Sequence, residues 1–68
     1  MTLSARNRLE GKITEFQLGG VMAHVVVQVG DNFIESVITR RSAEEMTLKV
    51  GDTVVAVIKS TEVMLQKD

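Results

Sequence analysis

Three short segments of this 68-residue chain place a basic side chain beside a hydroxyl, with no carboxylate between them. They are Ser4-Ala5-Arg6, Thr39-Arg40-Arg41-Ser42 and Lys59-Ser60-Thr61, and we refer to them as the basic–hydroxyl segments. Hydroxyl, guanidinium and ammonium groups all donate hydrogen bonds, so each segment offers donors without a competing negative charge. This pattern indicates a site for a small anion.

A tetrahedral dianion suits such a set of donors. It carries four acceptor oxygens and no donor, so hydroxyls, backbone N–H groups and cationic side chains are its best partners. The middle segment adds a further feature, because Ser42 is expected to open a helix, and a helix N-terminus presents free N–H groups to an anion. The candidate oxyanion ligands are Ser4, Arg6, Thr39, Ser42, Lys59 and Ser60.

Each candidate residue also has an ordinary structural use. A serine at a helix start usually caps that helix, a threonine is a common strand residue, and a lone basic side chain is usually solvated. The recurrence of the same pairing in three segments is what favours an anion site over three unrelated structural uses.

Catalytic and metal-binding patterns are missing from the sequence. The chain has no cysteine and one histidine, His24, which leaves too few side-chain ligands for direct metal coordination. The serines have only His24 as a histidine base, the acidic residues show no paired spacing, and the glycines do not form a phosphate-binding loop. We expect a binding protein without enzymatic activity or an organic cofactor, with His24 partly buried or at an interface.

The net charge of the chain does not favour binding to a polyanion. Nine acidic and eight basic residues give a net charge of −1, so the chain has no global positive field for nucleic acid or an anionic membrane. Charge appears at Arg6 before any apolar run of signal-peptide length, and no later stretch has the length of a membrane helix. We therefore expect a cytoplasmic protein whose anion site is local.

Alternating patterns predict three strands in the first part of the chain. Valine or alanine stands at every second position of residues 21–29, and residues 9–13 alternate in the same way. Gly19-Gly20 between these runs is typical of a hairpin turn. Gly30-Asp31-Asn32 marks a second turn, and the β-branched residues of 33–39 favour a third strand.

The rest of the sequence, from Ser42 onwards, predicts a short helix and two more strands. Ser42-Ala43-Glu44-Glu45 fits a capping box, so a helix of one or two turns is expected to start at Ser42. Gly51-Asp52 follows, and residues 53–58 and 61–65 are expected to be strands. Three strands, a short helix and two strands predict an all-β fold, a small five-stranded barrel of the oligonucleotide/oligosaccharide-binding (OB) type. Without linker composition or a repeat, residues 1–68 are expected to form a single domain.

The small size predicts association between subunits. A chain of 68 residues buries little surface, and domains of this size usually depend on disulfides, a structural metal or oligomerisation. Because cysteine is absent and histidine occurs once, a homo-oligomer is the remaining route to stability.

Several stretches resemble the molbindin family, also called Mop or TOBE domains. The run Ser4-Ala5-Arg6-Asn7, followed four residues later by Gly11, resembles the opening of that family. Residues 36–39 match its middle, and residues 50–65 are similar to its C-terminal half. The resemblance spans nearly the whole chain, and the opening tetrapeptide is specific in combination with the Ile-Lys-Ser-Thr-Glu-Val-Met run of residues 58–64.

This resemblance implies a homo-oligomer, a hexamer built as a trimer of dimers, that binds molybdate or tungstate for intracellular storage or buffering. Carried over by position, one part of the family's oxyanion site corresponds to Ser4, Arg6, Lys59 and Ser60. The part offered by a neighbouring subunit corresponds to Thr39 and Ser42. Arg40-Arg41 stands where family members vary, so its role is not inherited, and it either adds positive potential or is solvated.

Two other functional classes stay open at this point. An OB-type module for single-stranded nucleic acid would use aromatic stacking and a basic groove, but Phe16 and Phe33 are the only aromatic residues and the net charge is negative. A purely structural oligomerisation domain would use the basic–hydroxyl segments for interface hydrogen bonds alone. Tight binding of single-stranded DNA or RNA, with a steep loss of affinity in salt, would favour the first class. Titration with molybdate separates the second class from an oxyanion-binding protein.

Overall fold

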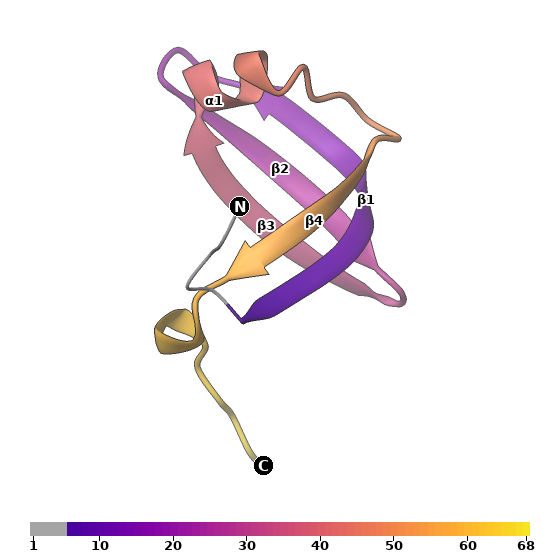
Figure 1. Cartoon of the computed structure of the whole chain (residues 1–68), viewed down its shortest axis with the longest axis vertical. Coiled ribbons are helices and arrows are strands. Elements are labelled where there is room, and N and C mark those ends of the chain that lie inside the picture. Colours follow the sequence, from indigo (N-terminus) through magenta and orange to yellow (C-terminus); the bar gives the residue numbers. More distant parts are fainter. Residues whose placement is uncertain (1–5) are drawn as a thin grey trace.

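The computed structural model describes residues 6–68, in which four strands form one antiparallel sheet (Figure 1). The helix α1 (Arg40–Glu45) follows the third strand, and a 3-10 turn, η1 (Ser60–Glu62), follows the fourth. An all-β fold with one short helix between the third and fourth strands is therefore confirmed. In the spatial order β3-β2-β1-β4, the strands are β3 (Asn32–Thr39), β2 (Met22–Val29), β1 (Asn7–Leu18) and β4 (Thr53–Ile58).

The long strand β1 joins the two halves of the sheet. Its first half pairs with β4, and its second half, from Lys12 onwards, pairs with β2. The register shifts between Ile13 and Glu15, which is the mark of a β-bulge. A bulge bends a strand and increases its twist. Because β1 bends, the sheet curls, and β3 and β4 come to line the same groove.

Both predicted hairpin turns are confirmed. Between β1 and β2, the Gly19 N–H donates to the carbonyl of Met22 at 2.8 Å. Between β2 and β3, Val29 pairs with Asn32, and Gly30 has a φ of 60°, a left-handed conformation that glycine adopts without steric cost. The turns thus set the register that places Thr39 opposite Met22.

The predicted strand over residues 61–65 is wrong for the single chain. Ser60–Glu62 forms η1 instead, in which the Glu62 N–H donates to the carbonyl of Lys59 at 2.9 Å, and Val63 onwards lies outside the sheet. The five-stranded barrel is consequently not confirmed, and the sheet of four strands is open. A strand forms only where a partner edge accepts its hydrogen bonds, and η1 turns the chain away from both edges (Figure 1).

The buried core of the described residues is small and consists mainly of aliphatic side chains. Ile13, 1% exposed, is the largest side chain in it, and Phe16, Ile38 and Leu48 pack partly buried around it. Gly11 lies where β1 approaches β2 so closely that an added Cβ would come within 2.8 Å of the Val27 side chain. The buried residues are Ile13, Ala23, Val25, Val26, Val27 and Ala43.

Candidate functional site

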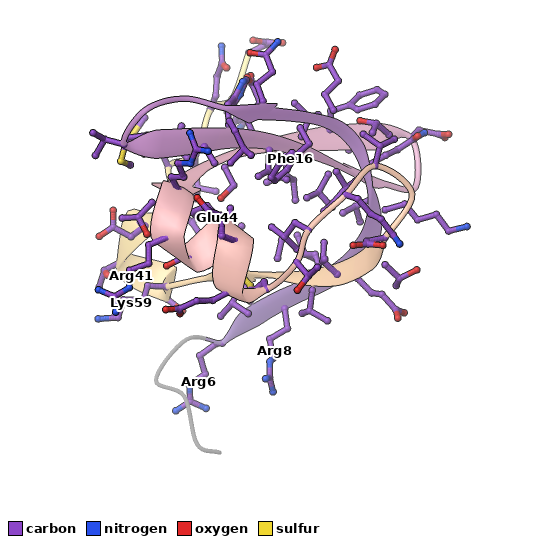
Figure 2. All side chains as sticks on the ribbon, turned by 90° about the horizontal axis from the view of Figure 1, so that it is seen from above. Arg6, Arg8, Phe16, Arg41, Glu44 and Lys59 are labelled. Carbon is purple, nitrogen blue, oxygen red and sulfur yellow. The ribbon has the colours of Figure 1, made fainter. Side chains whose placement is uncertain are left out.

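Two cationic candidates, Arg6 and Lys59, lie at adjacent strand ends. Arg6 precedes β1 and Lys59 follows β4. The last antiparallel pair between these strands is Asn7 with Ile58, and the Asn7 Nδ2 donates to the Ile58 carbonyl at 3.3 Å. Both cationic residues are exposed, and Figure 2 shows Arg6 projecting away from the body of the protein. Ser60, the first residue of η1, follows Lys59 directly.

No carboxylate neutralises this pair within residues 6–68. The ion pairs of that region join His24 to Glu35, Arg40 to Glu44 and Arg41 to Glu45, so neither Arg6 nor Lys59 takes part in one. Two cations at neighbouring strand ends create a local positive potential on a chain of net charge −1. Such a pair, with the Ser60 hydroxyl beside it, can hold an anion by charge-assisted hydrogen bonds.

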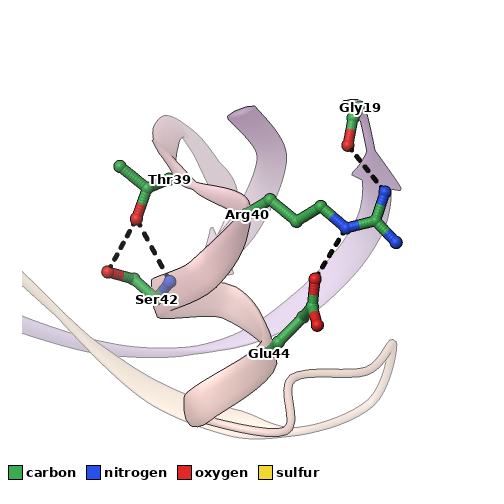
Figure 3. Close-up of polar contacts among 5 residues, drawn as sticks. All are labelled: Gly19, Thr39, Arg40, Ser42 and Glu44. Carbon is green, nitrogen blue, oxygen red and sulfur yellow. Dashed lines mark hydrogen bonds and ion pairs between the residues drawn. The ribbon is translucent and has the colours of Figure 1, made fainter. Parts of the chain in front are cut away.

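The other candidates, Thr39 and Ser42, lie at the start of α1. The helix begins at Arg40, two residues before the predicted start, and Thr39 is its N-cap. The Thr39 Oγ1 accepts a hydrogen bond from the Ser42 backbone N–H at 3.1 Å (Figure 3). The predicted capping box of Ser42 with Glu45 is therefore wrong. The backbone of Thr39 is extended, which lets the Thr39 hydroxyl reach the backbone N–H of Ser42. In the predicted capping box, the Glu45 side chain would have accepted that N–H.

The two hydroxyls differ in what they can offer a ligand. The Thr39 Oγ1 also donates to the Ser42 Oγ at 2.9 Å, so its proton is already in use within the chain (Figure 3). Ser42 accepts that bond and retains its own hydroxyl proton as a donor. Of the two predicted ligands on α1, Ser42 is thus the better placed donor, and Thr39 orients it.

Replacing Thr39 by alanine is expected to lower the free energy of unfolding by about 1 kcal/mol, because the helix loses its N-cap acceptor. Urea denaturation followed by circular dichroism measures this effect. Thr39→Ser retains the hydroxyl and is the matched control, with an expected loss well below that of alanine. Equal stability of wild type and Thr39→Ala would show that the cap bond contributes nothing.

Arg40 and Arg41 both have partners on the helix. The Arg40 Nε lies 2.6 Å from the Glu44 Oε1, and its Nη1 donates to the Gly19 carbonyl at 3.0 Å, which ties α1 to the β1–β2 turn (Figure 3). The Arg41 Nε lies 3.3 Å from the Glu45 Oε1, and its side chain is 90% exposed. The structure thus gives Arg40 a positioning role and leaves Arg41 as a solvated surface charge.

The single chain does not bring the two groups of candidates together. Arg6 and Lys59 lie at the Asn7 end of β1. Thr39 pairs with Met22, which follows the turn at the other end of β1, so Thr39 and Ser42 lie at the Leu18 end of the sheet. Figure 1 shows α1 and the end of β4 at opposite ends of the molecule. Ser4, the remaining candidate, lies outside the described residues.

His24 is partly buried, as predicted, and its Nε2 lies 2.9 Å from the Glu35 Oε1 on the neighbouring strand. Within residues 6–68, no three histidine, cysteine or acidic side chains come together as a metal site. The same region contains no helix of the length and apolarity needed to cross a membrane. Sequence reasoning missed the His24–Glu35 pair, although two strands in antiparallel register would bring these positions close.

A family model described as the TOBE domain matches residues 3–65 of the chain. The chain belongs to the TOBE-domain family. This TOBE domain is 46% identical over 66 residues to molybdenum-pterin-binding protein 1 of Clostridium pasteurianum, an alignment that covers 96% of this chain and 97% of the relative. The resemblance to the molbindins that residues 4–11, 36–39 and 50–65 indicated is thereby confirmed.

Solved structures agree with this assignment. The molybdate-binding protein from Sporomusa ovata superimposes on this TOBE domain with a TM-score of 0.94 at 36% identity, covering 98% of this chain and all of that one. The cytoplasmic molybdate-binding protein ModG, solved with molybdate bound, gives a TM-score of 0.82 at 36% identity, covering 88% of this chain and 43% of ModG. The fold is thus that of known molybdate-binding proteins.

Proposed function

We propose that this TOBE domain binds molybdate in the cytoplasm and serves to store or buffer it, with tungstate as an equivalent ligand. The observation that carries the proposal is the presence of Arg6 and Lys59 at adjacent strand ends, with neither cation in an ion pair within residues 6–68. The relatives named above, which are molybdenum- or molybdate-binding proteins, support molybdate as the anion.

Recognition in this proposal is by hydrogen bonds and charge. Molybdate is a tetrahedral dianion, so Arg6 and Lys59 donate charge-assisted hydrogen bonds to its oxygens, and the hydroxyls of Ser4, Ser42 and Ser60 occupy the remaining acceptors. Thr39 holds the Ser42 hydroxyl in place. Binding by these hydrogen bonds makes and breaks no covalent bond, so the protein acts as a binding protein and not as an enzyme. Tungstate has the same charge and shape, so the same donors serve it.

The site is completed between subunits of a homo-oligomer in this proposal. Arg6 and Lys59 lie at one end of β1 and Thr39 and Ser42 at the other, so a neighbouring copy must bring Ser42 to the cation pair. The small core of the described residues independently favours association. The family resemblance favours a hexamer built as a trimer of dimers.

The ligand we propose is the free oxyanion, although the name of the Clostridium relative includes a pterin. A pterin ring would need an aromatic or apolar platform beside the cations. Phe16 packs partly buried against the core, and Phe33 pairs with Gln28 near the β2–β3 turn, so neither side chain adjoins Arg6 or Ser42. The donors of the basic–hydroxyl segments suit an inorganic anion, and no organic cofactor is required.

Calorimetric titration with molybdate at neutral pH, with sulfate as the comparison anion, tests the proposed function. We expect saturable binding of molybdate and similar binding of tungstate, which has the same charge and shape, and sulfate is the smaller tetrahedral dianion for comparison. Native mass spectrometry of the same sample should find a hexamer with bound oxyanion. Absence of heat with molybdate, and absence of competition between the anions, would contradict the proposal.

A further inference from the structure

The short helix α1 has little apolar packing of its own against the sheet. Its buried residue is Ala43, 1% exposed, whose single methyl group makes too few contacts to fix the rotation of a helix. Polar contacts of Arg40 attach α1 to the β1–β2 turn instead. The Arg40 backbone N–H donates to the Val21 carbonyl at 2.8 Å, and the Arg40 Nη1 donates to the Gly19 carbonyl at 3.0 Å. The orientation of α1 therefore depends on Arg40.

The Arg40 guanidinium joins the helix to the turn in a defined geometry. Its Nε lies 2.6 Å from the Glu44 Oε1, one turn along α1, while its Nη1 reaches the Gly19 carbonyl (Figure 3). A guanidinium is planar and its N–H donors keep a fixed angle to each other, so the two contacts together orient the helix relative to the turn. Gly19 is itself held, because its N–H donates to the Met22 carbonyl at 2.8 Å.

The rotation of α1 decides where the Ser42 hydroxyl points. Ser42 follows Arg40 by two residues, which places it about 200° around the helix axis. Figure 3 shows the Thr39–Ser42 contacts and the Arg40–Glu44 contact on opposite sides of α1. The Ser42 backbone N–H is bonded to the Thr39 Oγ1 at 3.1 Å, so Ser42 moves with the start of the helix. A contact that fixes Arg40 on one side of α1 thus fixes the direction of the Ser42 hydroxyl on the other.

We infer that Arg40 is a positioning residue for the Ser42 hydroxyl, and that it acts through its bridge to Gly19 and not through its charge. Glu44 balances that charge at 2.6 Å, so Arg40 adds little positive potential of its own. A donor that is held in its binding orientation before the ligand arrives avoids the ordering cost of binding. The inference deepens the proposed function and rests on it in taking Ser42 as a donor to the oxyanion.

The neighbouring arginine is a matched control. Arg41 carries the same charge and also contacts a glutamate four residues on, Glu45, at 3.3 Å, but its side chain is 90% exposed and does not bridge to the turn. We expect Arg40→Ala to weaken molybdate binding roughly threefold to tenfold, the scale of the ordering cost of a side chain. Arg41→Ala should change the affinity by less than about twofold. Equal losses of affinity in calorimetric titrations of the two variants would overturn the inference.

Arg40→Lys separates the position of the side chain from its charge. Lysine retains the positive charge and can still pair with Glu44, but its ammonium group on a flexible stem lacks the planar fork that also reaches Gly19. Positioning predicts that Arg40→Lys binds molybdate about as weakly as Arg40→Ala does. An effect of charge predicts the affinity of the wild type, and that result would overturn the inference.

A double-mutant cycle shows whether Arg40 acts through Ser42. Ser42→Ala removes the hydroxyl that Arg40 positions, so adding Arg40→Ala to Ser42→Ala should have little further effect on the affinity for molybdate. A general loss of structure would instead weaken binding by the same factor in both backgrounds, and such additivity would overturn the inference. Circular dichroism verifies that each variant retains its strands, as expected because the bond from the Arg40 backbone to Val21 remains.

Amide hydrogen exchange of the ligand-free protein separates this inference from the proposed function. The Met46 N–H, which donates to the Ser42 carbonyl at 3.0 Å, reports the local opening of α1. Positioning predicts faster exchange of this amide in Arg40→Ala than in Arg41→Ala. Faster exchange, together with no molybdate binding by the wild type, would uphold the orientation of Ser42 by Arg40 and contradict the oxyanion site. Equal exchange in the two variants, together with molybdate binding by the wild type, overturns the positioning role and leaves the binding function standing.

Discussion

Lys59→Ala is expected to weaken molybdate binding by roughly tenfold to a hundredfold, since it removes a charge-assisted donor typically worth about 1.5–3 kcal/mol. Arg6→Ala should have a similar effect, because both cations lie at the same strand ends. Calorimetric titration at a fixed salt concentration measures the affinity of each variant. Both side chains are exposed, so the variants should fold as the wild type does.

Two controls separate direct contact from a general loss of positive charge. Lys49→Ala removes an exposed lysine from the loop before β4, and Arg8→Ala removes the arginine beside Arg6 in Figure 2. Each should change the affinity for molybdate much less than Lys59→Ala does. Wild-type affinity in both Lys59→Ala and Arg6→Ala would show that the oxyanion binds elsewhere.

Ile13→Ala is expected to lower the free energy of unfolding by about 2–5 kcal/mol, because it leaves a cavity in a core with little else to fill it. Ile13 packs against Val25 and Val27 where β1 bends. Its backbone also connects β1 to the loop before β4, since its N–H donates to the Asp52 carbonyl at 3.0 Å and its carbonyl accepts from the Gly51 N–H at 2.8 Å. Urea denaturation at one fixed protein concentration measures the loss, because oligomer stability depends on concentration.

The loss of stability should increase with the number of atoms removed from the Ile13 side chain. Ile13→Val deletes one methylene group and should cost about 0.5–1.5 kcal/mol. Val21→Ala removes an apolar side chain that is 76% exposed in the β1–β2 turn, and its effect should stay within about 0.5 kcal/mol. If Ile13→Ala were no more destabilising than Val21→Ala, the core of the protein would lie elsewhere.

Strands and turns could be predicted because their signals are local. The period-two pattern of residues 21–29 and the turn at Gly19-Gly20 require only neighbouring residues, and both agree with the structure. The boundaries of α1 were less predictable, because Thr39 and Ser42 are both good capping residues. Only the extended backbone of Thr39 decides which of them caps the helix.

The basic–hydroxyl segments were visible in the sequence, and the pairing of Arg6 with Lys59 followed once β1 and β4 were antiparallel neighbours. The distance of Arg6 and Lys59 from Ser42 could not be predicted from the sequence. The distance between two segments depends on the register of the intervening strands, and one slipped residue would alter every cross-strand pair. The sequence groups the site residues by chemistry, and the tertiary structure divides them between the two ends of β1.

By itself, the sequence determined the first four strands along the chain, the two hairpin turns, the small size of the core and the family likeness, because these follow from local patterns and composition. Only the tertiary structure decided that residues 63–65 leave the sheet and that a groove between β3 and β4 stays open. The apolar residues of this segment, Val63, Met64 and Leu65, are of types that suit a strand. Whether they form one depends on a partner edge, which is a property of the assembled chains and not of the segment.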